Sequence, residues 1–394
     1  MKRPFGKRPP GRSVLLSFLV LLLAFLLLEG GLRAAKYFHD WVYPPQERSF
    51  SGKPHLLSPY RDKPWAEVLF REIEESGRVV FRPFVEWRRP EYHGNFVNVD
   101  STGVRSTWNR DRRGTSPPEQ IFFSGGSAVW GNGARDDYTI PSLFSKKLYG
   151  RNYDFRVSNH GEKGYTFAQE IIHLLLCLKD GERPKYVFSY HGANDVYAAY
   201  QSGGALGIQN FEQIRERLAS RSDLWRIGEA IQNIIHKNST IYAAGKKIFI
   251  VYGKQQPFTE AGSRLSREGL ESLSMEIVKD YLKSMELLEY LSRAYDFRYF
   301  CFWQPVLFTE EFLTEEESKL DPRLQDRSLA FLYQRVNHLL GERRMPHFYN
   351  FAGVLKDRKK TCYTDFWHVT EEANEVIASR IFSIWTKEFG KKND

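Results

Sequence analysis

The sequence predicts an α/β fold in which a parallel sheet is covered by helices on both faces. From about residue 118, short apolar segments alternate with longer segments of helical periodicity. The apolar segments are continuous, which is typical of strands buried on both faces. Glycine-containing turns follow several of them. Such alternation favours a parallel sheet, whose ligand crevice lies beyond the carboxyl ends of the strands.

The expected strands cover residues 121–123, 155–159, 186–190, 297–303 and 347–351, and residues 247–252 are either a strand or a loop. The expected helices cover residues 140–148, 166–179, 211–237, 265–295 and 371–389. We assign residues 120–394 to one large domain. Within it, residues from about 196 to 296 form an expected insertion or lid, which is the expected place of substrate selection.

The positive charge of the chain is concentrated at its start. The 394 residues include 57 Lys and Arg against 48 Asp and Glu, a net charge of +9. Five basic residues and no acidic residue lie within the first twelve positions, so the remaining chain is close to neutral for its size. This distribution disfavours a nucleic-acid-binding function and indicates a topological signal.

A charge-free segment of sixteen residues, 13–28, follows this basic stretch. As a helix it would be roughly 24 Å long, close to the ~30 Å hydrocarbon core of a bilayer. A cleavable signal peptide is the alternative, but the available cleavage positions place Leu28, Glu29, Leu32 or Arg33 where a small residue is preferred. We therefore expect a cytoplasmic tail at 1–12, a transmembrane signal anchor at 13–32, and a stalk with an N-terminal cover at 33–119.

The cysteine and histidine patterns predict no metal site and no cofactor. The three cysteines, Cys177, Cys301 and Cys362, are far apart in the sequence and form no C-x-x-C motif. The H-E-x-x-H motif is absent, and no His, Asp and Glu set has the short spacing typical of metal ligands. The same scarcity of cysteine excludes a scaffold held by disulfides.

Ser127 lies in a glycine turn, SGGSAVWG, directly after the first expected strand. A serine there, with a helix behind it, suits a nucleophile whose own N–H group faces the reacting oxygen. A tight turn that needs glycine only for packing is the alternative. The α/β-hydrolase motif G-x-S-x-G is excluded because Val129 occupies its last glycine position.

Polar residues also follow the other expected strands. After residues 155–159 comes NHGEKGYT, in which Gly164 allows a backbone N–H to point into the crevice, and after residues 186–190 comes Asn194, whose amide can donate to an oxyanion. A loop histidine without a partner is more often structural than catalytic, so we do not expect His160, in the first of these loops, to be the base. Asp365 and His368 are three residues apart on a short turn, so the carboxylate can orient the imidazole.

Together these four blocks resemble the SGNH (GDSL-type) hydrolases, and in particular their membrane-anchored bacterial members. The matching blocks are GGSAVWG, NHGEKGYT, GAND and DFWH, and the resemblance covers about residues 121–389. It implies a three-layer, flavodoxin-like fold without a metal or cofactor. It further implies that Ser127, His368 and Asp365 are catalytic, and that the oxyanion hole consists of Ser127, Gly164 and Asn194. The usual Gly-Asp-Ser of the family is Gly-Gly-Ser here, with Gly126 in place of the aspartate.

The resemblance implies a serine ester hydrolase that acts on acyl esters, with O-acetyl esters of an envelope carbohydrate as the expected substrate. The alternatives are an O-acyltransferase to a cell-envelope glycan and a catalytically inactive envelope-binding scaffold. The expected partners are the acyl ester or acylated glycan and the membrane, and no nucleic acid. We expect a single-pass protein of the cytoplasmic or inner membrane with its catalytic domain on the extracytoplasmic or periplasmic side.

Overall fold

The computed structural model describes residues 53–111, 117–205, 207–211 and 260–390, with residue 214 and part of 16–33. The chain divides into two units, and the elements below belong to the unit made of Arg48–Gln213 and Glu260–Asp394. The expected tail at 1–12, the segment 247–252 and most of the expected helix 211–237 lie outside the described residues. Within the described part of the chain, no helix has both the length and the apolar character needed to cross a bilayer.

The centre of this unit is a five-stranded sheet in which every neighbouring pair is parallel. Its strands are β5 (Glu119–Gly125), β6 (Phe155–Asn159), β7 (Pro184–His191), β8 (Arg298–Trp303) and β9 (Phe348–Asn350). Their order in space is β6-β5-β7-β8-β9. The predicted α/β class with a parallel sheet is confirmed. Because the first strand of the sheet lies between the second and the third, this is the flavodoxin-like order, and ligands bind where the order reverses, between β5 and β7.

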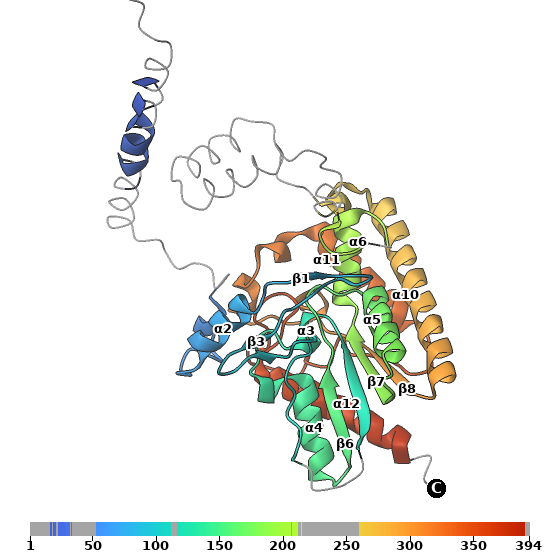
Figure 1. The fold of residues 1–394 in the computed structure, drawn as a ribbon. Coiled ribbons are helices and arrows are strands. Elements are labelled where there is room, and N and C mark those ends of the chain that lie inside the picture. The colour runs from blue at the N-terminus through green and yellow to red at the C-terminus, as the bar shows by residue number, and fades with distance from the viewer. Residues whose placement is uncertain are drawn as a thin grey trace, which may run out of the picture. The chain divides into compact units, whose positions relative to one another are not determined.

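One face of the sheet is covered by α4 (Ile140–Gly150) and α12 (Glu371–Gly390), which pack against each other (Figure 1). Aromatic rings fill this layer. Phe144 of α4 lies edge-on to Phe123 and Phe188 of the sheet, with ring centroids 5.3 and 5.2 Å away. Burying large aromatic side chains in this way supplies much of the apolar stabilisation of the fold.

The opposite face is covered by α5 (Phe167–Lys179) and α10 (Arg267–Tyr295), on which α11 (Arg327–Gly341) packs (Figure 1). Tyr281 of α10 contacts the ring of Trp303 in β8 with a centroid distance of 5.3 Å. Helices therefore cover both faces of the sheet. Of the expected insertion at 196–296, the described residues contribute most of α6 (Ala193–Ser202), all of α10 and one short turn between them.

Side-chain caps define where the long helices begin. Ser266 accepts a hydrogen bond from the N–H of Gly269 at the start of α10, and Asp326 accepts from Ser328 and Leu329 at the start of α11. Such caps satisfy N–H groups that have no partner inside the helix. The helices α6 and α11 were not expected from the sequence. The strands of the sheet and the helices α4, α5, α10 and α12 were expected, and their observed bounds differ from the expected ones mainly at their ends.

The N-terminal cover, described from residue 53, adds short elements in front of the sheet. They are the helix α2 (Ala66–Glu75) and two antiparallel hairpins, β1 (Val80–Arg82) with β2 (Glu86–Arg88) and β3 (Tyr92–His93) with β4 (Asn98–Val99). The short helix α3 (Ser127–Trp130) follows β5. The remaining 3₁₀ turns are Pro54–Leu56, Asp136–Tyr138, Ala261–Arg264, Leu307–Thr309, Glu317–Lys319 and Pro322–Gln325. Leu69, Val97 and Val99 of the cover form a buried cluster with Trp130. The cover is thereby packed onto the turn that follows β5.

Candidate active site

Ser127 is the first residue of α3, immediately beyond the carboxyl end of β5. The backbone packs closely at Gly125, where an added Cβ would lie 2.3 Å from the carbonyl oxygen of Tyr190 and 2.4 Å from Cγ2 of Val129. Only glycine fits such a close approach. The turn places Ser127 at the reversal of strand order, with 7% of its surface exposed.

The structure brings Ser127, His368 and Asp365 together in one hydrogen-bonded series. Ser127 Oγ lies 2.7 Å from His368 Nε2, and His368 Nδ1 lies 2.5 Å from Asp365 Oδ2. The carboxylate accepts from Nδ1–H, which leaves the lone pair of Nε2 to accept the serine proton. This tautomer is the one that a histidine needs to act as a general base toward a serine hydroxyl.

Asp365 is held in its ionised form by its surroundings. Its Oδ1 atom accepts hydrogen bonds from the backbone N–H groups of Trp367, at 3.0 Å, and His368, at 2.8 Å. Burial acts to raise the pKa of Asp365, but the charge and hydrogen bond of the His368 ring and the two backbone donors outweigh it, so the pKa lies below its usual value. An anionic carboxylate stabilises the imidazolium that forms when His368 takes a proton.

The side-chain amide of Asn194 lies beside the Ser127 turn. Its Nδ2 atom donates to the carbonyl oxygen of Tyr165 over 2.8 Å, and a Cβ added to Gly126 would be only 2.2 Å from it. An amide nitrogen carries two hydrogens, so one remains for another acceptor. Gly126, at the position where the Gly-Asp-Ser motif has its aspartate, therefore provides the space that the Asn194 amide occupies.

Gly164 and Asn194 share a neighbour that the sequence analysis missed, Gln209. Its Nε2 atom donates to Asn194 Oδ1 over 2.9 Å. Gly164 has a φ of +74°, and a Cβ there would be 2.9 Å from Gln209 Oε1. The three residues predicted for the oxyanion hole thus come from the segments after β5, β6 and β7, and Gln209 lies against two of them. No local motif marks Gln209 in the sequence.

Asn132 is a second polar residue that the sequence analysis missed. Its Nδ2 atom lies 3.3 Å from His368 Nε2, and its backbone N–H donates to the carbonyl oxygen of Ser127 over 3.0 Å. Its Oδ1 atom is buried and has no hydrogen-bond partner among the described residues. Asn132 therefore contacts both members of the serine–histidine pair. In the sequence, the only local indication that Asn132 lies in a tight turn is its position between two glycines, Gly131 and Gly133.

A buried arginine from the cover holds the end of α3. Arg105 donates from Nη1 to the carbonyl oxygens of Trp130, at 2.9 Å, and Gly131, at 2.8 Å, and from Nη2 to that of Ala134, at 2.7 Å. Its Nε atom pairs with Asp136 at 2.8 Å. Carbonyl groups at a helix end need partners from outside the helix. Arg105 satisfies them and so fixes the short helix that carries Ser127.

Arg89 and Glu162 connect the cover to the loop after β6. The Arg89 guanidinium lies 3.2 Å from the centre of the Trp130 ring, and Glu162 accepts the Arg89 backbone N–H over 2.8 Å. Burial, only partly opposed by Glu162, lowers the pKa of Arg89 to about 9. Glu162 also accepts from the N–H of Lys163 at 2.7 Å. The loop 160–164, which ends at Gly164, is therefore held by a buried ionic group.

A buried polar network lies behind the crevice. His191 Nδ1 is 3.1 Å from Glu170 Oε2, and His191 Nε2 is 2.9 Å from the Tyr281 hydroxyl. Burial raises the pKa of Glu170 well above its usual value and lowers the pKa of His191 to about 4. Burial therefore disfavours the charged form of both partners of this contact.

Asp195 follows Asn194 but does not face Ser127. Its Oδ1 atom accepts the N–H of Phe167, the first residue of α5, over 2.9 Å, while Oδ2 is buried without a hydrogen-bond partner among the described residues. Burial is the main cause that raises the pKa of Asp195 to about 7. Asp195 therefore holds the first turn of α5.

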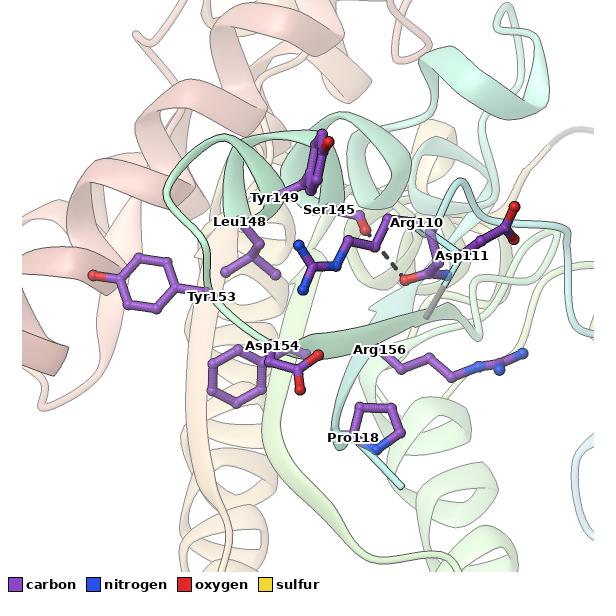
Figure 2. Close-up of a pocket in the computed structure, with 11 residues that line it drawn as sticks. Arg110, Asp111, Pro118, Ser145, Leu148, Tyr149, Tyr153, Asp154 and Arg156 are labelled. Carbon is purple, nitrogen blue, oxygen red and sulfur yellow. Dashed lines mark hydrogen bonds between the residues drawn. The ribbon is translucent and has the colours of Figure 1, made fainter. Parts of the chain in front are cut away.

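Three cavities of the described structure lie outside the serine turn. One of about 200 Å³ lies at the amino ends of β5 and β6, where Figure 2 shows Arg110, Asp154 and Arg156 around it. The second, of about 680 Å³, is lined by residues such as Lys63 and Glu316, and the third, of about 880 Å³, is lined by the first hairpin and α5. None of the three is lined by Ser127, so none is assigned to its chemistry.

No protein-family model matches the chain. No curated protein matches it. Among solved structures, the chain is similar to a carbohydrate acetylesterase family member from Sinorhizobium meliloti, with 13% identity, a TM-score of 0.36 and coverage of 69% of this chain and 99% of that chain. It is also similar to a member of the lipolytic protein G-D-S-L family from Veillonella parvula, with 11% identity, a TM-score of 0.35 and coverage of 68% and 98%.

A third similar structure is an acetyl xylan esterase, AlAXEase, with 12% identity, a TM-score of 0.34 and coverage of 67% of this chain and 98% of that chain. Identities and TM-scores this low assign neither a family nor an activity. What can be said of function therefore depends on the chain's own residues, and above all on the hydrogen-bonded series of Ser127, His368 and Asp365.

Proposed function

We propose that this chain is a serine ester hydrolase that cleaves acyl esters through an acyl-serine intermediate. The observation that carries the proposal is the pair of short contacts from Ser127 to His368, 2.7 Å, and from His368 to Asp365, 2.5 Å. These distances lie within or close to the range in which a base can take the proton of a nucleophile. The position of the three residues at the reversal of strand order adds support.

In the proposed reaction, His368 Nε2 takes the proton of Ser127 as Oγ forms a bond to the ester carbonyl carbon. The tetrahedral oxyanion then collapses, the bond to the leaving alcohol breaks, and the alcohol oxygen takes the proton from His368. A water molecule gives a proton to His368 and attacks the acyl carbon. The Ser127 Oγ–acyl bond then breaks, Ser127 regains the proton and the carboxylic acid leaves.

The oxyanion would be stabilised by the N–H groups of Ser127 and Gly164 and by the Asn194 amide. Donors fixed in advance in a water-poor site stabilise the charge that develops in the transition state, and the loss of one typically costs about 3–4 kcal/mol. The contacts of Asn194 with Tyr165 and Gln209 support this role, because they hold the amide in place before substrate binds.

For the substrate, we favour O-acetyl esters of a cell-envelope carbohydrate. The support is the sequence pattern of residues 1–32, a basic tail followed by an apolar segment, which favours a catalytic domain outside the cytoplasmic membrane. Envelope glycans are the acylated polymers accessible to such a domain. In this proposal the protein is a single-pass membrane protein whose crevice faces the extracytoplasmic or periplasmic space.

The test compares the full chain with its Ser127→Ala variant, using hydrolysis of p-nitrophenyl acetate and labelling by a fluorophosphonate probe. We expect the variant to lose both the labelling and at least about a thousandfold in kcat/KM. Ser379→Ala, which changes an exposed serine of α12, is the control and should leave both unchanged.

Unchanged hydrolysis or labelling in Ser127→Ala would sink the serine mechanism. Weak hydrolysis by the unmodified chain that rises when a glycan acceptor is added would instead indicate acyl transfer from the same serine. An absence of labelling in the unmodified chain would favour a catalytically inactive envelope-binding protein.

A further inference from the structure

A second group of chemically reactive side chains lies on the α5 face of the sheet. His160 directly follows β6, while His173 and Cys177 are four residues apart on one side of α5. One ligand atom from each of the three residues lies within 4.8 Å of the other two. The group is separate from the serine site, and neither the mechanism nor the oxyanion hole uses it.

The separations within this group match those of a tetrahedral metal site. His160 Nδ1 lies 3.2 Å from His173 Nε2, and His173 Nε2 lies 3.7 Å from Cys177 Sγ. In tetrahedral zinc coordination, the usual bond lengths place two nitrogens about 3.3 Å apart and a nitrogen and a sulfur about 3.6 Å apart. The third separation, from His160 to Cys177, is no more than 4.8 Å.

The ring of His160 is oriented by its neighbours. Ser158 Oγ lies 3.0 Å from Nε2, and the ring packs on Phe122 with a centroid distance of 4.1 Å. If Nε2–H donates to the serine hydroxyl, the lone pair of Nδ1 points at His173 and Cys177. A histidine that ligates a metal usually donates its other N–H to a nearby acceptor in this way.

The cluster opens onto a cavity. His160, His173 and Cys177 line the cavity of about 880 Å³, which leaves room for a water molecule or another ligand as fourth partner.

Arg88 is a nearby cation, and its charge is already engaged. Its guanidinium donates to the carbonyl oxygens of His160, at 3.2 Å, and Gly103, at 2.7 Å, and lies 3.7 Å from Glu162. Asp100, Asp180 and Glu182 line the same cavity. A cysteine thiolate would add a negative charge directly at the metal and reduce the charge that the surroundings must accommodate.

We propose that His160, His173 and Cys177 bind one zinc-class divalent ion, with a fourth coordination position open to the cavity. Two imidazoles and one thiolate suit zinc better than magnesium or calcium, which prefer oxygen ligands. The ion would tie the loop 160–164 to α5. Because that loop also contains Glu162 and ends at Gly164, the metal would fix the backbone on which one predicted oxyanion donor lies.

The sequence alone predicted no metal site, because the three ligands form no short motif. His160 comes from a loop and the other two from a helix thirteen and seventeen residues further on. The contact forms only when β6 and α5 pack together. Only the spacing of four between His173 and Cys177, which places them on one helix face, could be recognised from the sequence.

The experiment measures zinc binding by the full chain purified in detergent, stripped with a chelator and then dialysed against zinc at micromolar free concentration. We expect one zinc per chain by mass spectrometry of the metal, and an upward shift of the melting temperature. Cys177→Ser, close in size to the native residue, and His173→Gln should each weaken zinc binding at least about tenfold. His93→Ala, which removes a histidine whose side chain is 72% exposed, is the control and should bind zinc normally.

Cobalt provides a second readout that does not depend on ester hydrolysis. With Co²⁺, the unmodified chain should show the strong visible absorption of a tetrahedral ion and a thiolate charge-transfer band, and Cys177→Ser should lose that band. Equal zinc content in the control and in both ligand variants, or no bound zinc in the unmodified chain, would overturn the proposal. A chain that binds zinc but has no esterase activity would leave the metal site standing and overturn only the proposed hydrolase function.

Discussion

The side-chain amide of Gln209 donates a hydrogen bond to Asn194 Oδ1 over 2.9 Å. Because this oxygen is engaged, the Asn194 amide cannot exchange its nitrogen and oxygen without losing the contact, and Nδ2 stays directed toward Tyr165 and Gly126. Gln209 thereby acts on the proposed oxyanion hole through another residue.

Gln209→Ala should lower kcat for ester hydrolysis by about tenfold and leave KM nearly unchanged, since the amide is used mainly in the transition state. Asn194→Ala should lower kcat by about 10²–10³-fold. The double variant should be little worse than Asn194→Ala, because Gln209 acts through that residue. Gln325→Ala, on an exposed turn, is the control. Fully additive losses would contradict the positioning role.

Gly126→Ala should lower kcat with little loss of stability. A Cβ at this position would lie 2.2 Å from Asn194 Nδ2, so the amide must move, and the side chain can do so without displacing backbone. The expected loss is about 10²-fold or more, the effect of removing an oxyanion donor. Gly150→Ala is the matched control, because its added Cβ meets nothing within 4 Å. Equal steady-state kinetics of the two variants would refute this explanation of Gly126.

Asp365→Asn should lower kcat by about 10⁴-fold at neutral pH, because an amide cannot hold His368 in the required tautomer.

The lowered pKa of Asp365 also makes the stability of the fold depend on pH. The stability that its ionised form contributes is fully present above about pH 4, its usual pKa, and is lost as the pH falls toward the lower pKa of the folded state. Urea unfolding of both proteins between pH 3 and pH 7 should show their difference shrinking at the acid end.

Asp195→Asn should remove part of the acid-side pH dependence of stability. With a folded pKa of about 7, native Asp195 keeps a proton that the unfolded chain releases from about pH 4 upward. Its contribution to stability therefore falls as the pH rises from about 4 to 7 and is flat above that. The asparagine variant can still accept the Phe167 N–H, and its urea midpoint should decline less over this interval. An identical decline in both proteins would show that Asp195 titrates normally.

Arg105→Lys should reduce the free energy of unfolding by about 3–5 kcal/mol, the usual effect of breaking a buried ionic group. A lysine cannot reproduce the three carbonyl contacts, the pairing with Asp136 and the stacking 4.1 Å from the Trp130 ring. Urea denaturation at pH 7 provides the measurement. Arg343→Lys, at an exposed position, should change the free energy by less than about 0.5 kcal/mol.

Much of the central fold could be predicted because its signals are local. The strand at 155–159 was expected with the bounds that β6 has, and the glycine turns after β5 and β7 mark the crevice. Ser127, His368 and Asp365 were named through the resemblance of four short motifs to a known family, and their catalytic roles stay a prediction. The helix α11 was missed although Leu329, Leu332, Val336 and Leu340, all buried, follow helical spacing, so a reading of periodicity alone had the means to find it.

The supports of the site could not be predicted, because they depend on contacts distant in sequence. Arg105 reaches carbonyl groups 25 to 29 positions away, and Glu162 accepts from Arg89 at a separation of 73. A lone arginine in a sequence gives no indication of whether it is buried. The expectation that His160 is not the base is consistent with its position beside His173 and away from the Ser127–His368 pair.

The hold that Arg105 and Arg89 have on Trp130 also bears on where the functional domain begins. A protein cut back to residues 120–394 would contain every side chain of the Ser127, His368, Asp365 and Asn194 set. It would nevertheless lack both guanidinium groups that lie over the Trp130 ring, and with them the hydrogen bonds from Arg105 to the carbonyl oxygens of Trp130, Gly131 and Ala134. The minimal autonomous domain is therefore longer than the stretch of matching motifs, and dissection of this protein should retain the chain from residue 53 onward.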